Sequence, residues 1–330
     1  MKQIKLALDG MGGDNAPISP AKSCQLIRDN DLKIYLIGNK QKINKVLKKN
    51  LSFVEIIDCD DFVSMEEKIS LNLLKRKTSM KIAMEFLKEK KADFALSAGN
   101  TSAFVSYAVS ELGMIEGIEK PAIAVLFPNV LGNITVFIDA GANVNPKVEH
   151  LFQACLLGSI YSEVVFNMKN PKVGLLNVGS EETKGDELRK QVFKLLKEKR
   201  NINFIGNIEG HEIFTGKADV IVTDGFTGNI VLKTSEGITR SFRTILMKEI
   251  RRNLLGKIGL IFISKNLRSF ARKADYAEYG GGILLGVNGN VIISHGRSSP
   301  RAIYNAIKLG KKIVESKLLE KLKEIKWEWQ

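Results

Sequence analysis

The sequence has few residues of the types that build disulfide-stapled or metal-binding proteins. Its 330 residues include only three cysteines, three histidines, two tryptophans and seven prolines. Cys24, Cys59 and Cys155 are widely spaced and odd in number, which excludes a disulfide framework and suits a reducing cytoplasm. No group of residues has the spacing of zinc ligands, so we expect no bound metal.

Long apolar runs are also missing. No stretch approaches the roughly 20 apolar residues that a membrane-spanning helix needs. The first residues, MKQIKLALDG, lack the long apolar core and the small-residue cleavage site of a signal peptide. We therefore expect a cytoplasmic protein, and its hydrophobic fraction of 44% is ample for a folded core.

Several motifs of nucleotide binding and covalent catalysis are absent as well. There is no Gly-x-Ser-x-Gly nucleophile elbow. The glycine pair near the start is not followed by Gly-Lys-Ser/Thr, and GMGGDN lacks the glycine spacing of a dinucleotide site. We find neither a nicotinamide site nor clustered metal carboxylates, so a dehydrogenase is disfavoured and no cofactor is expected.

Positive charge, in contrast, is abundant. The chain has 50 Lys and Arg against 36 Asp and Glu, a formal net charge of +14. Such a balance favours an acidic partner, which can be nucleic acid, anionic lipid or an acidic protein. A lysine-rich surface without any partner is the plain alternative.

The central stretch from Val173 to Lys233 contains three short apolar runs that stop at polar clusters. The runs are Val173 to Leu176, Asn203 to Ile205 and Ala218 to Val222, and the clusters after them begin at Asn177, Gly206 and Thr223. Short apolar runs bounded by turn residues predict buried parallel strands. Ligands of open α/β sheets bind beyond the carboxyl ends of the strands, so we expect these clusters to share one rim that forms the site.

The same alternation runs through the rest of the chain. Predicted strands at Ile4 to Leu8, Asp93 to Leu96 and Ile134 to Ile138 are each followed by a turn rich in Gly, Asn or Asp and then by a helix. We expect Asn15 to cap a helix that runs to about Arg28, and Asn145-Pro146 to start another in the same way. The pattern predicts a parallel, helix-flanked sheet. Residues 64–77 are polar and compatible with either a mobile flap or a plain surface helix.

Seven segments, in order along nearly the whole chain, resemble the phosphate acyltransferase (PlsX) family. They are LALDGMGGDNAP, LSAGNTSAF, KPAIAVLFP, IDAGANVNP, the central stretch, DYAEYGGGILLG and ISHGRSSPRAIYNAI. Each motif alone is weak, but together they are highly specific. Ser102 stands where the family usually has Gly, and Gly282-Ile283 replaces a more usual Ala-Pro or Ala-Ser.

The resemblance implies a fold, a reaction and partners. The fold would be one domain over residues 1–330, a Rossmann-like three-layer α/β/α sandwich with a mostly parallel sheet, related to phosphotransacetylases and isocitrate-type dehydrogenases. The reaction would make acyl phosphate from acyl-[acyl-carrier-protein] and inorganic phosphate for phospholipid (phosphatidic acid) synthesis. The implied partners are acyl carrier protein, a second subunit, an anionic membrane surface and the membrane glycerol-3-phosphate acyltransferase, but no nucleic acid.

Such a reaction needs an anion cradle, donors for the developing oxyanion and help for the leaving thiolate. Lys184 can act as a point charge on phosphate, Asp224 can orient phosphate or take its proton, and His295 can protonate the leaving sulfur. The alternatives are a solvated loop lysine, a helix cap and a structural histidine; the asparagines can equally be turns or caps. The candidate site comprises Lys184, Asp224, Asn229 and His295 as catalytic residues, and Gly12, Gly13, Asp14, Asn15, Asn100, Thr101, Asn143, Asn177 and Asn207 as residues that bind phosphate or the thioester.

Two other functions stay open from the sequence. One is a phosphate acetyltransferase-like enzyme that uses acyl-CoA, and the other is a non-catalytic membrane scaffold for lipid enzymes. Residues 240–273 are predicted to be a protruding amphipathic helical segment, since ten basic residues and one acid, Glu249, flank the apolar run LLGKIGLIFI. That run suits an interfacial anchor, a core segment or a dimer contact. Its predicted membrane contacts are Leu254, Leu255, Ile258, Leu260, Ile261 and Phe262.

Overall fold

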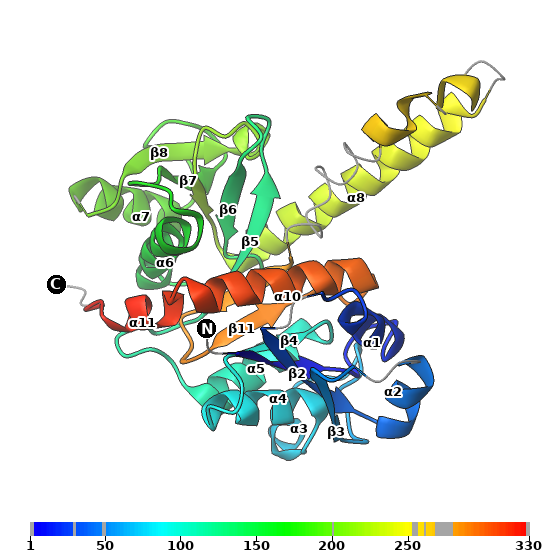
Figure 1. Cartoon of the computed structure of the whole chain (residues 1–330). Coiled ribbons are helices and arrows are strands. Elements are labelled where there is room, and N and C mark those ends of the chain that lie inside the picture. The colour runs from blue at the N-terminus through cyan, green and yellow to red at the C-terminus, as the bar shows by residue number, and fades with distance from the viewer. Residues whose placement is uncertain are drawn as a thin grey trace.

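The chain folds into three layers, with helices on both faces of a single eleven-stranded sheet (Figure 1). This computed structural model describes residues 3–28, 31–47, 51–199, 201–252, 257–260, 262–267 and 280–327. The predicted three-layer α/β/α architecture is confirmed. Seven of the ten strand pairings along the sheet are parallel, as the alternation of strands and helices predicts.

The elements follow one another in the order that the hydrophobic pattern predicts. The strands are β1 (Ile4–Asp9), β2 (Leu32–Gly38), β3 (Val54–Asp58), β4 (Phe94–Ser97), β5 (Ala122–Pro128), β6 (Ile134–Ile138), β7 (Val173–Asn177), β8 (Phe204–Glu209), β9 (Val220–Val222), β10 (Gly282–Leu285) and β11 (Asn290–Ile293). The helices are α1 (Ile18–Cys24), α2 (Lys40–Val46), α3 (Leu71–Lys75), α4 (Ser79–Lys88), α5 (Thr101–Leu112), α6 (Val148–Phe166), α7 (Glu187–Glu198), α8 (Gly225–Ile250), α10 (Pro300–Glu315) and α11 (Leu318–Lys323).

The sheet consists of two parallel halves that run in opposite directions. Its strand order is β3-β2-β1-β4-β11-β10-β5-β6-β9-β7-β8. The strands from β3 to β11 are mutually parallel and form the first half; β6, β9, β7 and β8 are parallel to one another and form the second half. Three successive antiparallel pairings, β11–β10, β10–β5 and β5–β6, reverse the direction between them. The site residues that follow β1 and β4 therefore cannot share a rim with those that follow β7 and β9 through strand direction alone.

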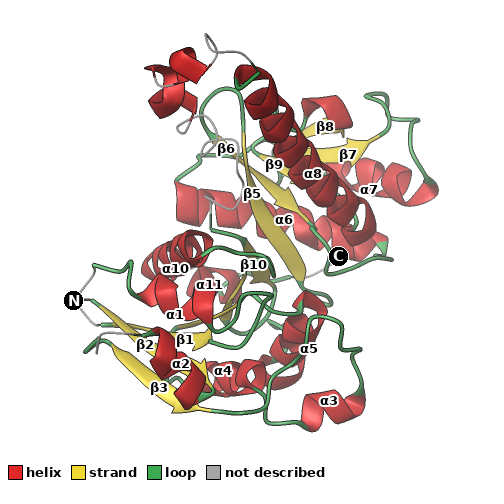
Figure 2. Cartoon of the chain, turned by 90° about the vertical axis from the view of Figure 1, so that its right-hand side faces the viewer, coloured by secondary structure: helices red, strands yellow, loops and turns green. Residues whose placement is uncertain are grey.

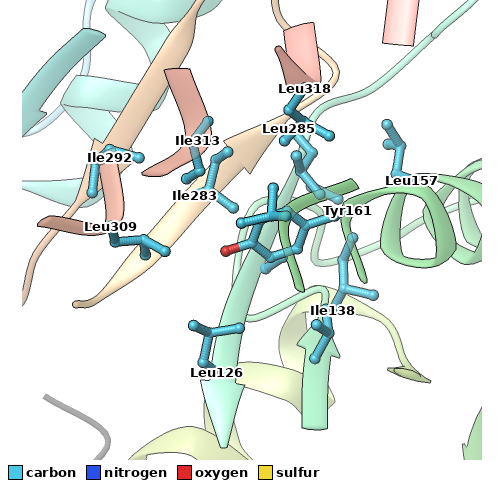
Figure 3. Packing of buried hydrophobic residues seen from close by; sticks show 14 of the residues in the cluster. Leu126, Ile138, Leu157, Tyr161, Ile283, Leu285, Ile292, Leu309, Ile313 and Leu318 are labelled. Carbon is cyan, nitrogen blue, oxygen red and sulfur yellow. The ribbon is translucent and has the colours of Figure 1, made fainter. Parts of the chain in front are cut away.

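One apolar core lies on each face of the sheet. The larger core packs α1, α2, α6, α7, α10 and α11 against one face, and the smaller packs α3, α4 and α5 against the other. Figure 3 shows the middle of the larger core, where Tyr161 from α6 lies among aliphatic side chains from both halves, including Leu126, Ile138, Ile283 and Leu309. Burying an aliphatic side chain stabilises a fold by about 1.5–3 kcal/mol, so this core joins the two halves into one unit.

Two predicted helix starts are wrong. Helix α1 begins at Ile18 with Pro17 as its N-cap and without a side-chain cap, and it ends at Cys24. The chain enters it through backbone turns, in which the carbonyl of Gly13 accepts from the N–H of Ala16 and that of Asn15 from Ser19. Helix α6 likewise begins at Val148, after Lys147, and not at Asn145. In both places the asparagine therefore lies outside the helix, in the turn that leads into it.

Helix α8 projects from the body of the protein, as Figures 1 and 2 show. It carries exposed apolar side chains from its first turn to its last, namely Phe226, Ile230, Ile238, Phe242 and Ile245. Residues 257–260 and 262–267 beyond it are also helical. Of the predicted membrane contacts, Ile258 and Phe262 are exposed and Leu260 is half-buried, whereas Leu254, Leu255 and Ile261 lie outside the described residues. Among the helices of the described part of the chain, none is long and apolar enough to cross a membrane.

Residues 64–77 are largely a loop that contains the five-residue helix α3. Arg76 ties this loop together through ion pairs with Asp61 and Glu67 and through a hydrogen bond to the carbonyl of Phe62 at 3.1 Å. The structure therefore places a short surface helix here, and the flap motion stays a prediction.

Candidate active site

The loop between β7 and α7 carries Lys184, and two buried asparagines hold it. Asn177 ends β7 and donates from Nδ2 to the carbonyl of Lys184 at 3.1 Å; Asn207 donates from Nδ2 to the carbonyl of Glu181 at 2.8 Å. The second apolar run of the central stretch was predicted to stop at Gly206, but β8 continues to Glu209, so Asn207 lies inside the strand. The structure thus brings Asn177, Asn207 and Lys184 together as predicted, although the two asparagines contact protein carbonyls.

Asp224 caps α8 and forms an ion pair with Arg189. Its Oδ1 accepts from the N–H of Thr227 at 2.8 Å, and its Oδ2 lies 2.5 Å from the Arg189 guanidinium. Burial alone would raise the pKa of Asp224, but the hydrogen bonds from Thr227 and Arg189 and the charge of Arg189 outweigh it and lower that pKa. Its carboxylate is therefore a weak proton acceptor, and the arrangement supports the capping alternative.

The first N–H groups of α8 are used within the protein. The N–H of Gly225 donates to the carbonyl of Asn143 at 2.7 Å, and that of Gly228 to the carbonyl of Asp224 at 2.9 Å. Close approach also explains Gly228, since a Cβ there would collide with the carbonyl of Asp139. Near the start of this helix, the side chain of Asn229 is exposed to solvent.

Asp139, which follows β6, organises the loop that contains Asn143. This buried carboxylate accepts from the backbone N–H groups of Ile123, Gly141, Ala142 and Asn143 at 2.7–3.0 Å. The Asn143 side chain donates to the Pro121 carbonyl at 2.5 Å and to Asp139 at 3.3 Å. Asn143 thus shapes the turn, while its role as a substrate ligand stays a prediction.

The turn after β1, with the predicted residues Gly12 to Asn15, is packed tightly against its neighbours. A Cβ on Gly12 would come within 2.8 Å of the Gly99 nitrogen, and one on Gly13 within 2.8 Å of the Gly296 carbonyl oxygen. The N–H of Asp14 donates to that same carbonyl at 2.8 Å. These glycines allow loops to meet, which is a packing role where the sequence suggested an anion cradle.

Asn100 holds a neighbouring loop to the start of α5. Its Oδ1 accepts from the N–H of Ala103 at 3.1 Å, and its Nδ2 lies 3.1 Å from the Glu67 carbonyl and 3.2 Å from the Met65 carbonyl. Thr101 is the exposed first residue of that helix. The Asn100 amide is therefore engaged in a helix cap and in loop attachment.

His295 is the point where the two halves of the site meet. It follows β11, and its Nε2 lies 3.6 Å from the carboxylate of Glu236 on α8, whereas its Nδ1 accepts from the N–H of Arg297 at 3.1 Å. Arg297 in turn lies 3.5 Å from the carboxylate of Asp14. Helix α8 thus connects a rim of the second half with His295 and Asp14 of the first half, which strand direction alone would separate.

The surroundings of His295 keep its imidazole neutral. Burial lowers its pKa, the positive charges of Lys233 and Arg297 lower it further, and Glu236 raises it only in part. A neutral imidazole at physiological pH is a better proton acceptor than donor. In His295 the lone pair of Nδ1 is already engaged by the Arg297 N–H and Nε2 carries the proton, so the predicted protonation of the leaving sulfur stays a prediction.

Sequence reasoning missed four residues that organise the site: Asp9, Asp139, Arg189 and Glu236. Asp9 and Asp139 directly end apolar runs, and this position was a usable signal for buried strand-end carboxylates. Arg189 and Glu236 lie within charged helices, where their neighbours conceal them. All three cysteines are buried, and burial raises the pKa of each thiol, so none of them is a ready nucleophile.

The sheet and its flanking helices define an α/β protein of the phosphotransacetylase-like fold. The structure is similar to EutD phosphotransacetylase from Staphylococcus aureus, with a TM-score of 0.59 and 16% identity over 94% of each chain. A 4-hydroxythreonine-4-phosphate dehydrogenase from Klebsiella pneumoniae matches with a TM-score of 0.54 and 11% identity, over 95% of this chain and 100% of that one. Identities this low show the fold alone, and they bear out the predicted relation to phosphotransacetylases and to dehydrogenases.

The sequence comparisons identify the family. The family described as "Fatty acid synthesis protein" matches residues 4–321. The phosphate acyltransferase of Thermodesulfovibrio yellowstonii is 43% identical over 97% of this chain and 94% of that one, and that of Carboxydothermus hydrogenoformans is 44% identical over 96% and 97%. The chain belongs to the phosphate acyltransferase family. It is a transferase of lipid synthesis whose reaction joins an acyl group to phosphate.

Proposed function

We propose that the acyl donor is acyl carrier protein and that the product, acyl phosphate, serves phosphatidic acid synthesis. The phosphate oxygen attacks the thioester carbonyl, the tetrahedral intermediate collapses, and the carrier leaves as a thiolate that is then protonated. Phosphate is itself a competent nucleophile near neutral pH, so the reaction needs no covalent intermediate with the enzyme. The three buried cysteines accord with this route.

The observation that carries the proposal is the exposed cation of Lys184 on a fixed loop. Its ammonium group has no hydrogen bond or ion pair within the described residues. A free cation beside buried amides binds a phosphate dianion through charge-assisted hydrogen bonds. His295, which lies between Glu236 and Arg297, gives the leaving sulfur its proton from Nε2.

The positive charge of the projecting segment supports an acidic carrier protein as the donor. Between residues 240 and 267, Glu249 is the only acidic residue. The described basic residues there are exposed: Arg240, Arg243, Lys248, Arg251, Arg252, Lys257 and Lys265. An acidic carrier protein is attracted to such a surface at low ionic strength, and salt weakens the attraction.

The test compares Lys184→Ala with the matched control Lys190→Ala, another exposed lysine six positions along the chain. We expect Lys184→Ala to raise the KM for phosphate and lower turnover, at a cost of about 1.5–3 kcal/mol, whereas Lys190→Ala leaves both unchanged. Phosphate saturation curves of thiol release, with acyl carrier protein and acyl-CoA as alternative donors, give both readouts. Wild-type phosphate kinetics in Lys184→Ala would refute the phosphate role, and equal use of acyl-CoA would favour a phosphotransacetylase-like donor.

We also propose that the projecting segment serves assembly on a membrane. The exposed apolar side chains of α8 from Phe226 to Ile245 support a homodimer, and Ile258 and Phe262, the latter 82% exposed, support contact with an anionic membrane on its cytoplasmic side. The membrane glycerol-3-phosphate acyltransferase would then receive acyl phosphate nearby.

Phe242→Glu should convert a dimer to a monomer in sedimentation analysis, and Phe262→Glu should abolish sedimentation with anionic vesicles while activity in solution persists. A monomeric wild-type protein, or unchanged vesicle binding of Phe262→Glu, would contradict these assignments.

A further inference from the structure

Two side-chain hydrogen bonds from the sheet hold the loop of residues 178–186, which carries Lys184. Asn207, which is only 4% exposed, holds the carbonyl of Glu181, and the 7% exposed Asn177 holds the carbonyl of Lys184. The N–H of Lys184 also donates to the carbonyl of Glu181 at 3.2 Å, so this carbonyl accepts two hydrogen bonds. Both ends of the turn that presents the lysine are therefore fixed to strand ends.

Two glycines complete this fixation. Gly185 has a φ of +93°, and a Cβ there would come within 2.5 Å of Oδ1 of Asn177. A Cβ on Gly179 would lie 3.0 Å from Cγ of Lys184, so the lysine stem crosses directly over this glycine. Because the loop backbone is rigid and Gly179 leaves a path open for the side chain of Lys184, the direction of the ammonium group is set before any ligand binds.

We propose that Asn177 and Asn207 are positioning residues, which act on phosphate through Lys184 and do not touch the substrate. This inference rests on the proposed role of Lys184. It replaces the expectation that both amides bind phosphate or the thioester, because their N–H groups already hold carbonyls of the loop. Misplacing a catalytic or binding group by about 1 Å can cost up to about 100-fold in rate, which gives the two bonds a functional consequence.

The unused oxygen of Asn207 makes the proposal testable. Its Oδ1 is buried and has no hydrogen-bond partner within the described residues, while its Nδ2 does all the holding. The reverse orientation of the amide would place an oxygen against the carbonyl oxygen of Glu181, where nothing can be donated. The Nδ2 donor of Asn207 should therefore be the group that matters. Aspartate has the same shape as asparagine, and at position 207 it should replace this donor when its carboxyl is protonated but not when it is ionised.

The experiment measures kcat and KM for phosphate in Asn207→Asp over a range of pH, each normalised to wild type at the same pH because phosphate itself titrates. We expect KM for phosphate to rise at least about tenfold where the new carboxyl is ionised, and to recover as the pH falls and its O–H donates to Glu181. The KM for the acyl donor should stay unchanged. The matched control is Asn203→Asp, since Asn203 precedes the same strand and also donates to a backbone carbonyl, that of Asn170, at 2.8 Å.

Asn177→Ala provides a second variant in case Asn207→Asp does not fold. It should show the same loss specific to phosphate, without recovery at low pH. Adding Asn207→Asp to Lys184→Ala should cause no further loss, because the asparagine acts through the lysine. An additive loss in the double variant, an equal loss toward both substrates, or no recovery of a folded Asn207→Asp at low pH would overturn the inference. Wild-type kinetics in Lys184→Ala would instead refute the proposed function, so the two failures are distinguishable.

Discussion

Each half of the sheet contains a strand that leads into a loop with a buried aspartate at its start. The two loops use this aspartate differently. Asp9 starts DGMGGDNAP after β1, and Asp139 starts DAGANVNP after β6. Asp9 accepts from the Ser97 hydroxyl at 2.6 Å and from the N–H of Met11 at 3.0 Å. Asp139 accepts from four backbone N–H groups and an amide side chain.

This difference separates a closed rim from an open one. In the first half, a side chain links two strand ends and the glycines bring their loops into contact, which leaves no room for a side chain at Gly12 or Gly13, while Asp14 and Asn15 beside them are exposed. In the second half, each loop is stabilised largely by its own carboxylate or amides, which leaves Lys184 and Asn229 exposed. A glycine-rich turn after a strand is thus no sign of an anion site until its neighbours are known.

The largest expected effect is on Asp139. Asp139→Ala leaves four backbone N–H groups without their acceptor, and each buried unsatisfied donor costs about 1–3 kcal/mol. We expect a loss of more than about 3 kcal/mol in the free energy of unfolding, measured by urea denaturation. Asp9→Ala, which leaves fewer donors without an acceptor, is the matched comparison. An equal loss in both variants would remove the distinction between the two loops.

The next effect concerns Asp224, at the open rim. Asp224→Asn deprives the buried Arg189 guanidinium of its closest carboxylate, and breaking such a pair costs about 3–5 kcal/mol when it is fully buried. We expect a loss of roughly 2–3 kcal/mol, since Arg189 keeps the more exposed Asp186. Thermal melting with rate per folded molecule is the measurement, and Asp186→Asn is the control. A variant that melts like wild type but has lost its rate would restore Asp224 as a catalytic residue.

A smaller effect depends on pH and tests the closed rim. Burial raises the pKa of Asp9 above its usual 3.8, although hydrogen bonds from Ser97, Ser79, Met11 and Gly12 oppose the shift. A raised pKa in the folded state means that the stabilisation is complete below the unfolded pKa and is lost as the pH rises through the folded one. Wild type should therefore lose stability relative to Asp9→Asn as the pH rises from the unfolded to the folded pKa of Asp9. The expected loss is about 1.4 kcal/mol for each pH unit between these two pKa values.

Urea unfolding of wild type and Asp9→Asn at a series of pH values measures this difference. Asp139 also has a pKa raised by burial, but it is present in both proteins and cancels. A stability difference that does not change with pH would show that the Asp9 carboxyl has the same pKa in the folded and unfolded states.

Much of the fold could be predicted from the sequence, because strands and helices leave local patterns. The apolar runs that became β7 and β9 and the predicted strands that became β1, β4 and β6 were all readable from residue order. The reversal between the halves was not, because β10 comes from residues 282–285 and inserts between β11 and β5. Strand insertion is a long-range event that no local pattern encodes.

The candidate site was predictable in position more than in role. The strand-end residues Asn143 and Asn177 lie where the sequence placed them, but their hydrogen bonds go to protein atoms. Whether an amide binds a ligand or a loop depends on how the chain folds back on it, as when Asn177 meets the carbonyl of Lys184, and the turn residues alone do not show this. Lys184 escaped this ambiguity, because a long cationic side chain in a polar turn reaches solvent, whereas its direction depends on how the loop is held.

The smallest effect compares two buried tyrosines, one on each side of the sheet. Tyr107 in α5 donates its hydroxyl hydrogen to the carbonyl of Leu73 at 2.7 Å. Tyr161 in α6 is fully buried among aliphatic side chains, and its hydroxyl meets no hydrogen-bond partner within the described residues (Figure 3). Burial raises the pKa of Tyr161 strongly, as expected for a phenol that has no polar neighbour to stabilise its ionised form.

Tyr161→Phe removes the unpaired hydroxyl and keeps the edge-to-face contact with Phe166, whose ring centre lies 5.2 Å away. We expect a gain of up to about 1 kcal/mol in the free energy of unfolding, because an unsatisfied buried hydroxyl carries a desolvation cost that phenylalanine avoids. Tyr107→Phe should instead lose about 1 kcal/mol, since it removes a buried hydrogen bond and leaves the Leu73 carbonyl with the N–H of Arg76 alone, at 3.0 Å. Urea denaturation of both variants measures the contrast. A loss in Tyr161→Phe as large as that in Tyr107→Phe would mean that the Tyr161 hydroxyl has a partner, such as a buried water molecule, in the core that joins the two halves.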